Sequence, residues 1–402
     1  MKRSNTSTMR LTYMTSVVQW IGVALLLACS VALLAQNFNA PKPVVVAYVF
    51  PQEQVIQPGQ IAAKKLTRIN YAFANVRDGR VVEGFPSDAQ NYTALVALKK
   101  DNPELTVLVS VGGWLWSGNF SDAALTPESR ARFAKSAVEF IERYNLDGLD
   151  VDWEYPAQAG AGNRFRPEDK QNYTLVLKEI RREFDQEEKK LHRRLYLTIA
   201  TGASPEFLEH TEMTEVQKYV DTINLMAYDY YEPDSDATTG NHAPLFLDPA
   251  DPKQVSADKS VQAYEAAGVL ASKIVLGVPF YGHVWGHVSS RNHGLFQPGK
   301  QVAGAFTKYS DPASMLKNGF KRYWDQAASA PYLYNAQKGI FVSYEDPQSL
   351  RLKCAYVREH RLAGIMFWTY GSDRSGALLN TIDASLGIDP GSAVTTSRAE
   401  VQ

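Results

Sequence analysis

Short apolar runs alternate with amphipathic helical patterns along most of the chain, and this alternation constrains the fold more than any other feature. Each run is rich in β-branched and aromatic residues and is apolar almost throughout. Continuously apolar runs of this length are typical of parallel strands whose two faces are both buried. We predict eight strands, at residues 44–50, 68–76, 106–114, 146–155, 194–202, 221–231, 273–282 and 362–371.

Helical patterns occupy the intervals between these runs. Thr126 suits an N-cap and Pro127 a first helical position, so a helix is expected to follow them. Residues 167–192, 256–269 and 347–360 show further helical spacing. Eight strands with intervening helices predict the α/β class, and within it a (β/α)8 TIM barrel. A doubly wound sheet is the alternative, which is disfavoured because no glycine-rich phosphate-binding sequence follows the first strand.

The barrel is predicted to occupy residues 41–388 and to carry one insertion. The interval between the seventh and eighth strands is too long for a loop without structure of its own. We therefore predict a small inserted α+β subdomain at residues 283–345, between those two strands. Residues 389–402 are small and polar, which indicates a disordered tail.

Residues 1–40 are expected to serve export rather than the fold. Lys2, Arg3 and Arg10 precede an apolar run at residues 17–35, and a basic segment before an apolar one indicates a secretory signal peptide. The run is also long enough to span a bilayer, so a signal peptide and an uncleaved membrane anchor both remain open. Either alternative predicts an exported protein, secreted or periplasmic, that meets a membrane only through this segment.

The charge and the cysteine content exclude some classes of protein. A formal net charge of −1 argues against a nucleic-acid partner, because such partners favour strongly basic surfaces. Cys354 is the only cysteine outside the N-terminal segment, so the barrel has no internal disulfide. Packing must therefore stabilise the fold, and we expect a monomer.

The fourth predicted strand differs from the others because it carries acidic residues at alternate positions. Asp150, Asp152 and Glu154 share one face of a strand, while Val151 and Trp153 lie on the other. If the apolar residues pack outward against helices, the three carboxyl groups point into the barrel. A barrel interior is normally filled with apolar side chains, so acids there cost free energy unless they are paired, bound to a metal or catalytic.

Repulsion along this column of acids predicts which member carries a proton. Neighbouring side chains on one strand face lie about 7 Å apart, and two like charges at that distance repel by roughly 2 kcal/mol at an effective dielectric constant of about 20. This repulsion is expected to raise one pKa by about 1.5 to 2 units. Glu154 lies nearest the carboxyl end of the strand, where a ligand can reach it, so we predict it to be the proton donor.

A metal site and a merely structural set of acids are the alternatives to catalysis. The Asp-x-Asp-x-Glu spacing superficially resembles the start of a calcium loop. However, Tyr155 stands where such a loop needs glycine, and Ala161 stands where it needs a bidentate glutamate. No histidine occurs in this segment. We therefore predict no metal and no cofactor, and we favour a catalytic role for the acids.

The acids and their surroundings resemble a known family. The spacing Asp147-x-x-Asp150-x-Asp152-x-Glu154, followed by Tyr-Pro, resembles the catalytic signature of glycoside hydrolase family 18, the chitinases. The resemblance extends over residues 44–388. Further segments that match the family are Ser110–Trp114, Met226–Asp229, Thr239–Leu245, Gly277–Gly282 and Phe367–Trp368.

The resemblance implies hydrolysis of β-1,4 bonds between N-acetylglucosamine units, with retention of configuration and with the substrate's own acetamido group as nucleophile. Glu154 would protonate the glycosidic oxygen and later act as base. Asp152 would orient the acetamido group, and Asp150 would share a proton or a hydrogen bond with Asp152. Tyr228 would donate a hydrogen bond to the acetamido oxygen. The strand spacing between the two last acids lies in the range usually associated with inversion, but substrate-assisted families are exceptions to that rule.

The resemblance also implies an enzyme that binds chitin or chitooligosaccharides. The inserted subdomain corresponds to the family's insertion domain. A purely structural role in the core is the alternative for Tyr48, Phe73 and Trp368. Further tryptophans that could stack on sugars are Trp116, Trp285 and Trp324. The positions that match the family's substrate-binding residues are Tyr48, Phe73, Gly113, Trp114, Met226, Asp229, Tyr281 and Trp368.

The sequence also predicts roles for Asp147 and His283. Asp147 is expected to be a structural hydrogen-bond partner, and His283 stands where many relatives carry arginine, which leaves the contacts of that loop open.

A non-catalytic carbohydrate-binding relative would lack the acid of the signature, whereas Glu154 and both aspartates are present. An endo-β-N-acetylglucosaminidase that acts on other glycans is the second alternative, although the insertion favours a linear chain such as chitin.

Overall fold

A computed structural model describes residues 42–308 and 312–389 of the protein. The predicted signal peptide or anchor, with its apolar run at residues 17–35, lies outside the described residues, as does the predicted tail beyond residue 389. Among the described residues, no helix combines the length and the apolar character needed to cross a membrane.

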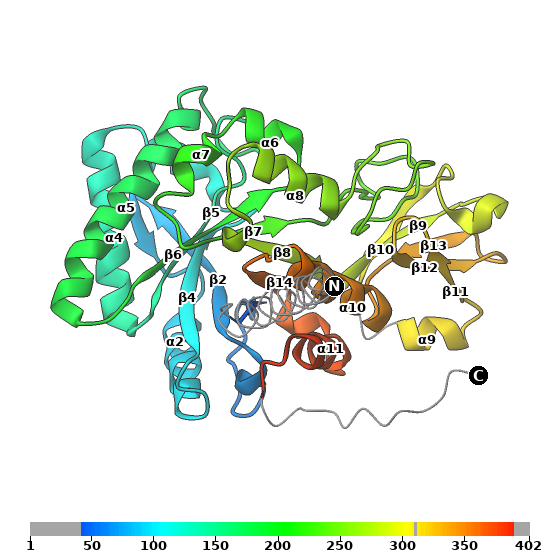
Figure 1. The fold of residues 1–402 in the computed structure, drawn as a ribbon, viewed down its shortest axis with the longest axis horizontal. Helices are drawn as coiled ribbons and strands as arrows, with labels where there is room; N and C mark the ends of the chain where they lie inside the picture. The colour runs from blue at the N-terminus through cyan, green and yellow to red at the C-terminus, as the bar shows by residue number, and fades with distance from the viewer. Residues whose placement is uncertain (1–41, 309–311, 390–402) are drawn as a thin grey trace, which may run out of the picture. The chain divides into compact units, whose positions relative to one another are not determined.

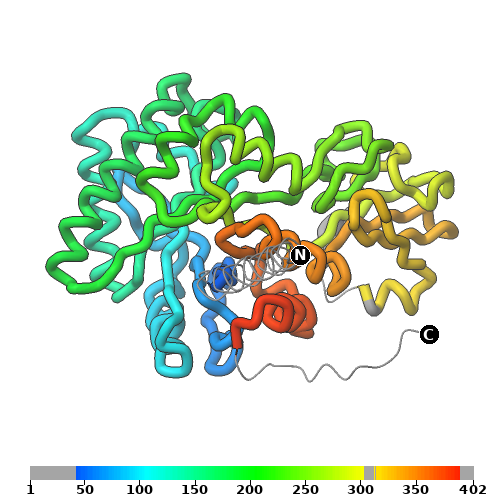
Figure 2. Tube along the Cα trace, in the orientation of Figure 1, coloured from blue at the N-terminus to red at the C-terminus, as the bar shows by residue number. Residues whose placement is uncertain are grey.

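Eight parallel strands close into a barrel within the described part of the chain, which confirms the predicted (β/α)8 fold. Neighbours in the barrel follow chain order, and the last strand completes the ring by pairing with the first. Figures 1 and 2 show this closure, with the first strand in blue beside the last in orange. The barrel strands are β1 (Val44–Val49), β2 (Arg68–Arg77), β4 (Thr106–Gly112), β5 (Gly148–Asp152), β6 (Tyr196–Gly202), β7 (Thr222–Met226), β8 (Ile274–Pro279) and β14 (Gly364–Trp368), and β3 (Arg80–Val82) pairs antiparallel with β2.

Each predicted strand overlaps an observed one, but six of the observed strands end earlier than predicted, and β5 and β7 are the two that matter for the site. β5 ends at Asp152 and β7 ends at Met226. The chain then leaves the sheet, and Asp229 adopts a φ of 57°, a left-handed conformation that does not continue a strand. Glu154 and Tyr228 therefore lie on loops just beyond the carboxyl ends of their strands, which is where barrel enzymes build their sites.

Helices connect the strands, and all four predicted helices are present (Figure 1). The helix predicted after Thr126 begins with a capping box, because the Thr126 hydroxyl accepts a hydrogen bond from the Ser129 amide and the Ser129 hydroxyl accepts one in return. The helices are α2 (Asp88–Ala97), α3 (Phe120–Ala123), α4 (Pro127–Tyr144), α5 (Asp169–Leu191), α6 (Pro205–Glu209), α7 (Met213–Val216), α8 (Ala257–Ala266), α10 (Pro347–Glu359) and α11 (Ala377–Leu386), with short 3-10 turns η1 (Ala63–Lys65), η2 (Leu98–Lys100), η3 (Ser117–Asn119), η4 (Ala271–Lys273), η5 (Arg291–Gly294) and η6 (Tyr370–Ser372).

A five-stranded antiparallel sheet lies between β8 and β14 in the sequence, as expected for the predicted α+β insertion. Its strands pair in the order β10–β9–β13–β12–β11. Trp285, Tyr332, Tyr334 and Phe341 belong to a small hydrophobic cluster, which Tyr231 from the loop after β7 also joins. The sheet begins at Tyr281, two residues before the predicted boundary. Its elements are β9 (Tyr281–Gly286), β10 (Lys300–Lys308), α9 (Pro312–Lys317), β11 (Lys321–Asp325), β12 (Ala330–Asn335) and β13 (Ile340–Ser343).

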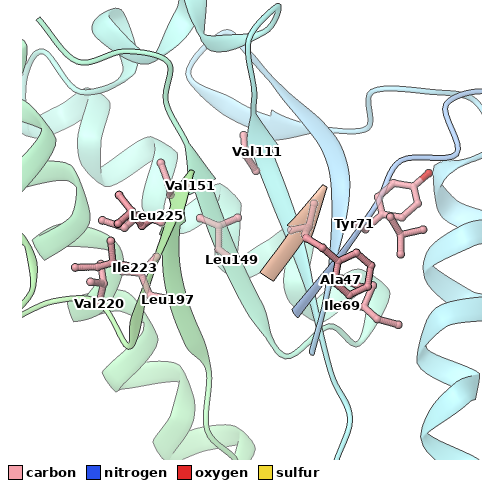
Figure 3. Packing of buried hydrophobic residues seen from close by; sticks show 14 of the residues in the cluster. Ala47, Ile69, Tyr71, Val111, Leu149, Val151, Leu197, Val220, Ile223 and Leu225 are labelled. Atoms are coloured by element: carbon pink, nitrogen blue, oxygen red, sulfur yellow. The ribbon is translucent and has the colours of Figure 1, made fainter. Parts of the chain in front are cut away.

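The main hydrophobic core lies between the barrel strands and the helices, and it includes the apolar residues of β5. Figure 3 shows Leu149 and Val151 among the apolar side chains of neighbouring strands. Just beyond them, the Trp153 ring stacks on Phe120 at 5.3 Å and meets the edge of Tyr173 at 5.8 Å. The predicted outward direction of these side chains is confirmed, so the two aspartates between them face the barrel interior.

Candidate active site

The carboxylate of Asp150 lies at the centre of the barrel, where side chains from four other strands converge on it. The hydroxyls of Tyr48 and Ser110 donate to Oδ2 at 2.9 and 2.8 Å. The hydroxyl of Thr198 and the amide of Asn224 donate to Oδ1 at 2.5 and 3.0 Å. Because all four groups act as donors, the arrangement suits an ionised carboxylate.

Two opposing effects act on the pKa of Asp150. Burial raises this pKa, while the hydroxyl donors and the nearby charge of Arg68 lower it, and burial has the larger effect. The family resemblance predicts that Asp150 shares a proton or a hydrogen bond with Asp152. Among the described residues, the hydrogen bonds to Asp150 come from the four donors instead. The two aspartates therefore influence each other through charge.

Asp152 is buried one step nearer the mouth of the barrel, in surroundings that disfavour a carboxylate. Its Oδ1 atom has no hydrogen-bond partner among the described residues. Burial raises the pKa of Asp152 well above its ordinary value, and the charges of Glu154 and Asp150 raise it further. Asp152 is thus favoured in its protonated form, and it has an unused polar atom with which to hold a ligand.

The loop after β5 holds Glu154 by its backbone. The Glu154 amide donates to the Ser117 hydroxyl at 2.9 Å, and that hydroxyl lies 3.1 Å from the carbonyl oxygen of Asp152. Asn163 donates its side-chain amide to the Glu154 carbonyl oxygen at 3.1 Å. The side chain of Glu154 remains partly exposed. The backbone is therefore fixed while the carboxyl group stays accessible, as proton transfer to a ligand requires.

The pKa of Glu154 is raised to about 7. Burial is the largest cause, a hydrogen bond from Tyr155 opposes it, and the charges of Asp229 and Glu232 add to it. The direction agrees with the sequence-based prediction, but the principal cause differs, because repulsion within the column acts chiefly on Asp152. An acid whose pKa lies near neutral pH can both donate and accept a proton in one reaction cycle.

Five predicted site residues meet in one aromatic cluster next to these acids. The cluster contains Tyr48, Phe73, Met226, Tyr228 and Trp368. The Trp368 ring stacks on Phe73 at 5.5 Å with 22° between the planes, and it contacts Tyr48 at 5.9 Å. Burial, followed by the charge of neighbouring carboxylates, raises the pKa of Tyr228 well above its ordinary value. The Tyr228 hydroxyl therefore keeps its proton and remains a hydrogen-bond donor.

The loop after β4 supplies two further predicted positions. Gly113 has a φ of 75°, and a Cβ there would lie 2.6 Å from the Phe73 ring, so this position requires glycine. Trp114 is 50% exposed, and its ring meets Tyr155 at 6.2 Å, which leaves a flat apolar surface open to a ligand. Trp285 is fully buried in the insertion, so the prediction that it stacks on a sugar is wrong.

Asp229 joins the loop after β7 to the first strand of the insertion. The Tyr281 hydroxyl lies 2.6 Å from both carboxylate oxygens, and His283 Nε2 lies 2.8 Å from Oδ1. His242 Nδ1 lies 3.5 Å from the same oxygen. Burial alone would raise the pKa of Asp229, but the two histidines outweigh it and hold that pKa well below its ordinary value. Asp229 therefore stays ionised, and its charge acts on Glu154.

Most of the groups that hold the acids in place are not among the residues predicted from the sequence. Ser110 was noted only within a matching segment, and Thr198, Asn224 and Ser117 were not singled out. Thr198 and Asn224 are polar residues at interior-facing positions of apolar strands, and that alternation could have identified them. Asp147, by contrast, has the predicted structural role, because its carboxylate accepts a hydrogen bond from a β4 backbone amide at 2.7 Å.

Proteins of known sequence are similar to this chain. The family described as glycosyl hydrolases family 18 matches residues 44–373. Chitinase A1 of Niallia circulans is 42% identical over 314 residues, which cover 74% of this chain and 45% of that protein. The chain thus spans less than half the length of that relative. Chitinase 1 of Aphanocladium album is 33% identical over 359 residues, which cover 82% of each protein.

A solved structure is also similar to this chain. It belongs to a glycoside hydrolase family 18 N-acetylglucosaminidase from Paenibacillus barengoltzii, with a TM-score of 0.80 and 41% identity. The match covers 85% of this chain and 99% of that one. The family match includes the whole barrel and its inserted sheet. The chain therefore belongs to family 18 of the glycosyl hydrolases.

Proposed function

We propose that the protein is an exported chitinase, which hydrolyses β-1,4 bonds between N-acetylglucosamine units. One observation carries the proposal. Asp150, Asp152 and Glu154 form a column in which the last carboxyl group is partly exposed at the barrel mouth and has a pKa of about 7. Chitin and chitooligosaccharides are supported as substrates by the relatives named chitinases, which are 42% and 33% identical to this chain.

In the first step, Glu154 donates its proton to the glycosidic oxygen while the bond to the anomeric carbon breaks. The acetamido oxygen of the same sugar attacks that carbon and forms an oxazolinium-type intermediate, so no protein nucleophile is needed. Asp152, with its unused Oδ1 atom among the described residues, accepts the acetamido N–H. Tyr228 donates its hydroxyl to the acetamido oxygen and so fixes the direction of attack.

In the second step, water opens the intermediate with the Glu154 carboxylate as base, so the product keeps the configuration of the substrate. A pKa of about 7 suits both roles, because the group is readily protonated and readily deprotonated at neutral pH. Trp368, supported from behind by Phe73, offers a flat surface beneath the reacting sugar. The sugar is held between this surface and the column of acids.

We also propose that the protein is exported and monomeric. The basic residues ahead of the apolar run at residues 17–35 support export. The run then either is removed after secretion or holds the enzyme at the membrane. An insoluble polymer cannot enter the cell, so an enzyme that degrades it must act outside.

Exo-acting N-acetylglucosaminidase activity is a second candidate. The similar solved structure from Paenibacillus barengoltzii is an N-acetylglucosaminidase, and this chain covers 99% of it. Both candidates use the same acid and the same acetamido chemistry. They differ in which bond of a linear oligosaccharide is cut first.

Product analysis on chitopentaose tests both candidates. We expect cleavage by the wild-type protein, and mass spectrometry of the first products separates internal cuts from release of single N-acetylglucosamine units. Glu154→Gln should lower kcat by about 10²- to 10⁴-fold, since it removes the proton donor. Glu104→Gln, at an exposed position, is the matched control and should leave kcat unchanged. Binding of chitopentaose without any cleavage by the wild type would instead support a carbohydrate-binding protein.

A further inference from the structure

Three possible metal ligands from separate elements meet at the Asp229 carboxylate. Asp229 follows β7, His242 lies in the loop before α8, and His283 lies in β9. His283 Nε2 lies 2.8 Å and His242 Nδ1 lies 3.5 Å from Asp229 Oδ1, and all three atoms lie within 4.8 Å of one another. Residues 54 positions apart in the chain are thus brought together around one point.

His242 provides a second, independent indication of a ligand. Its side chain is completely buried, its Nδ1 lies 3.5 Å from Asp229 Oδ1, and its Nε2 has no hydrogen-bond partner among the described residues. A buried imidazole held by only this one long contact costs free energy that a metal ion on Nδ1 would recover. The backbone around it is fixed, because the His242 amide donates to the Ser343 hydroxyl at 2.9 Å and its carbonyl accepts from the Tyr230 amide at 3.1 Å.

The geometry suits a small divalent ion. A Zn²⁺ ion with bonds of about 2.1 Å separates the ligand atoms of a tetrahedron by about 3.4 Å. The edge between Asp229 and His242 already has this length, and the edge between Asp229 and His283 must open by about 0.6 Å. Two imidazoles and one carboxylate are ligands for zinc and related transition metals rather than for calcium or magnesium, which prefer oxygen.

The charges around the three ligands also favour a cation. Asp229 stays ionised, and its side chain is 32% exposed while the histidines are buried. The exposed edge gives an ion a route to the buried nitrogens. The carboxyl group of Glu232 lies close enough for the charge of Asp229 to raise its pKa, after burial as the larger cause, to about 7. A bound cation would relieve this repulsion between neighbouring acids.

We propose that Asp229, His242 and His283 bind a divalent transition-metal ion such as Zn²⁺, and that this binding reversibly inhibits hydrolysis. The inhibition part rests on the proposed function, and the binding part does not. Inhibition follows because Asp229 holds the Tyr281 hydroxyl at 2.6 Å and the Tyr281 ring contacts that of Tyr228 at 6.2 Å, so a metal on Asp229 disturbs the position of Tyr228. The metal also competes with the Tyr281 hydroxyl for the Asp229 carboxylate.

Calorimetric titration with ZnCl₂ tests the site directly. The full-length protein is first treated with EDTA and then titrated in its wild-type, His242→Asn and His283→Asn forms. The wild type should bind one Zn²⁺ ion per chain, and each variant should bind it about 100-fold more weakly or not at all. His287→Asn is the matched control, because His287 is exposed on the same insertion. It should bind zinc as the wild type does.

Two further measurements keep the test independent of folding and of catalysis. Circular dichroism identifies any variant that fails to fold, and zinc anomalous diffraction from a wild-type crystal then locates the ion without any variant. Zinc bound elsewhere, or equal binding by all four proteins, contradicts the proposal, as does the absence of binding by the wild type. If zinc binds at this site but chitopentaose hydrolysis by the wild type does not fall, the inhibition part is wrong and the binding part stands.

Discussion

Replacing Glu154 with glutamine is predicted to stabilise the protein by an amount that depends on pH. Glutamine keeps the size of the side chain and removes its charge. Folding raises the pKa of Glu154 from 4.5 to about 7, so the folded state resists ionisation of this group. Glu154 therefore does not change the free energy of unfolding of the wild type at low pH. It lowers that free energy as the pH rises above the pKa of Glu154 in the unfolded chain.

The size of the effect follows from the two pKa values. A rise of about 2.5 units corresponds to about 3.4 kcal/mol at about 1.36 kcal/mol per unit. This cost begins near the unfolded pKa and is complete once the pH exceeds the folded pKa. Because Glu154 is partly exposed, solvent screening reduces it. We expect Glu154→Gln to gain about 2 kcal/mol over the wild type above neutral pH and almost nothing at acidic pH.

Urea denaturation followed by tryptophan fluorescence measures this gain. The two proteins are compared at about pH 4, 6 and 8, which bracket the transition from one pKa to the other. Glu104→Gln, at an exposed position, is the control and should match the wild type at each pH. A difference between Glu154→Gln and the wild type that stays constant across this range would refute the reasoning, because Glu154 would then ionise equally in both states.

Three other substitutions test how the surroundings position the acids. Gly113→Ala should lower the free energy of unfolding by about 1–3 kcal/mol in urea denaturation, because its Cβ would lie 2.6 Å from the Phe73 ring. Ser117→Ala should cost about 1–3 kcal/mol by leaving the Glu154 amide without its partner. It should also lower kcat on chitopentaose more than it changes KM. Trp153→Ala should cost about 3–5 kcal/mol, since its ring is buried behind β5. An unfolding midpoint equal to that of the wild type contradicts each of the three.

The fold could be predicted from the sequence because each of its strands and helices has a recognisable local sequence pattern. All eight predicted runs overlap a barrel strand, and the helix after Thr126 begins at its predicted cap. The strand ends were less predictable. β5 stops at Asp152 although the alternation of acidic and apolar residues continues through Glu154. A pattern of side chains does not show where the backbone stops pairing with a neighbouring strand.

The site was predicted where the acids lie close together in sequence, and much less where distant residues converge. The column from Asp150 to Glu154 could be recognised from alternation alone. The four donors around Asp150 come from four other strands, and only the closed barrel brings them together. The predicted cause of the raised Glu154 pKa, repulsion within the column, is wrong for the same reason. Its added charges come from Asp229 and Glu232, far away in sequence.

Anomeric NMR of the first products from chitopentaose tests the central claim most directly. The claim is that Glu154 acts as acid and base while the substrate supplies the nucleophile. It predicts that the wild type releases the β-anomer first and that Glu154→Gln releases almost none. Early release of the α-anomer would show inversion and contradict the substrate-assisted mechanism. Undiminished hydrolysis by Glu154→Gln would contradict the assignment of the acid.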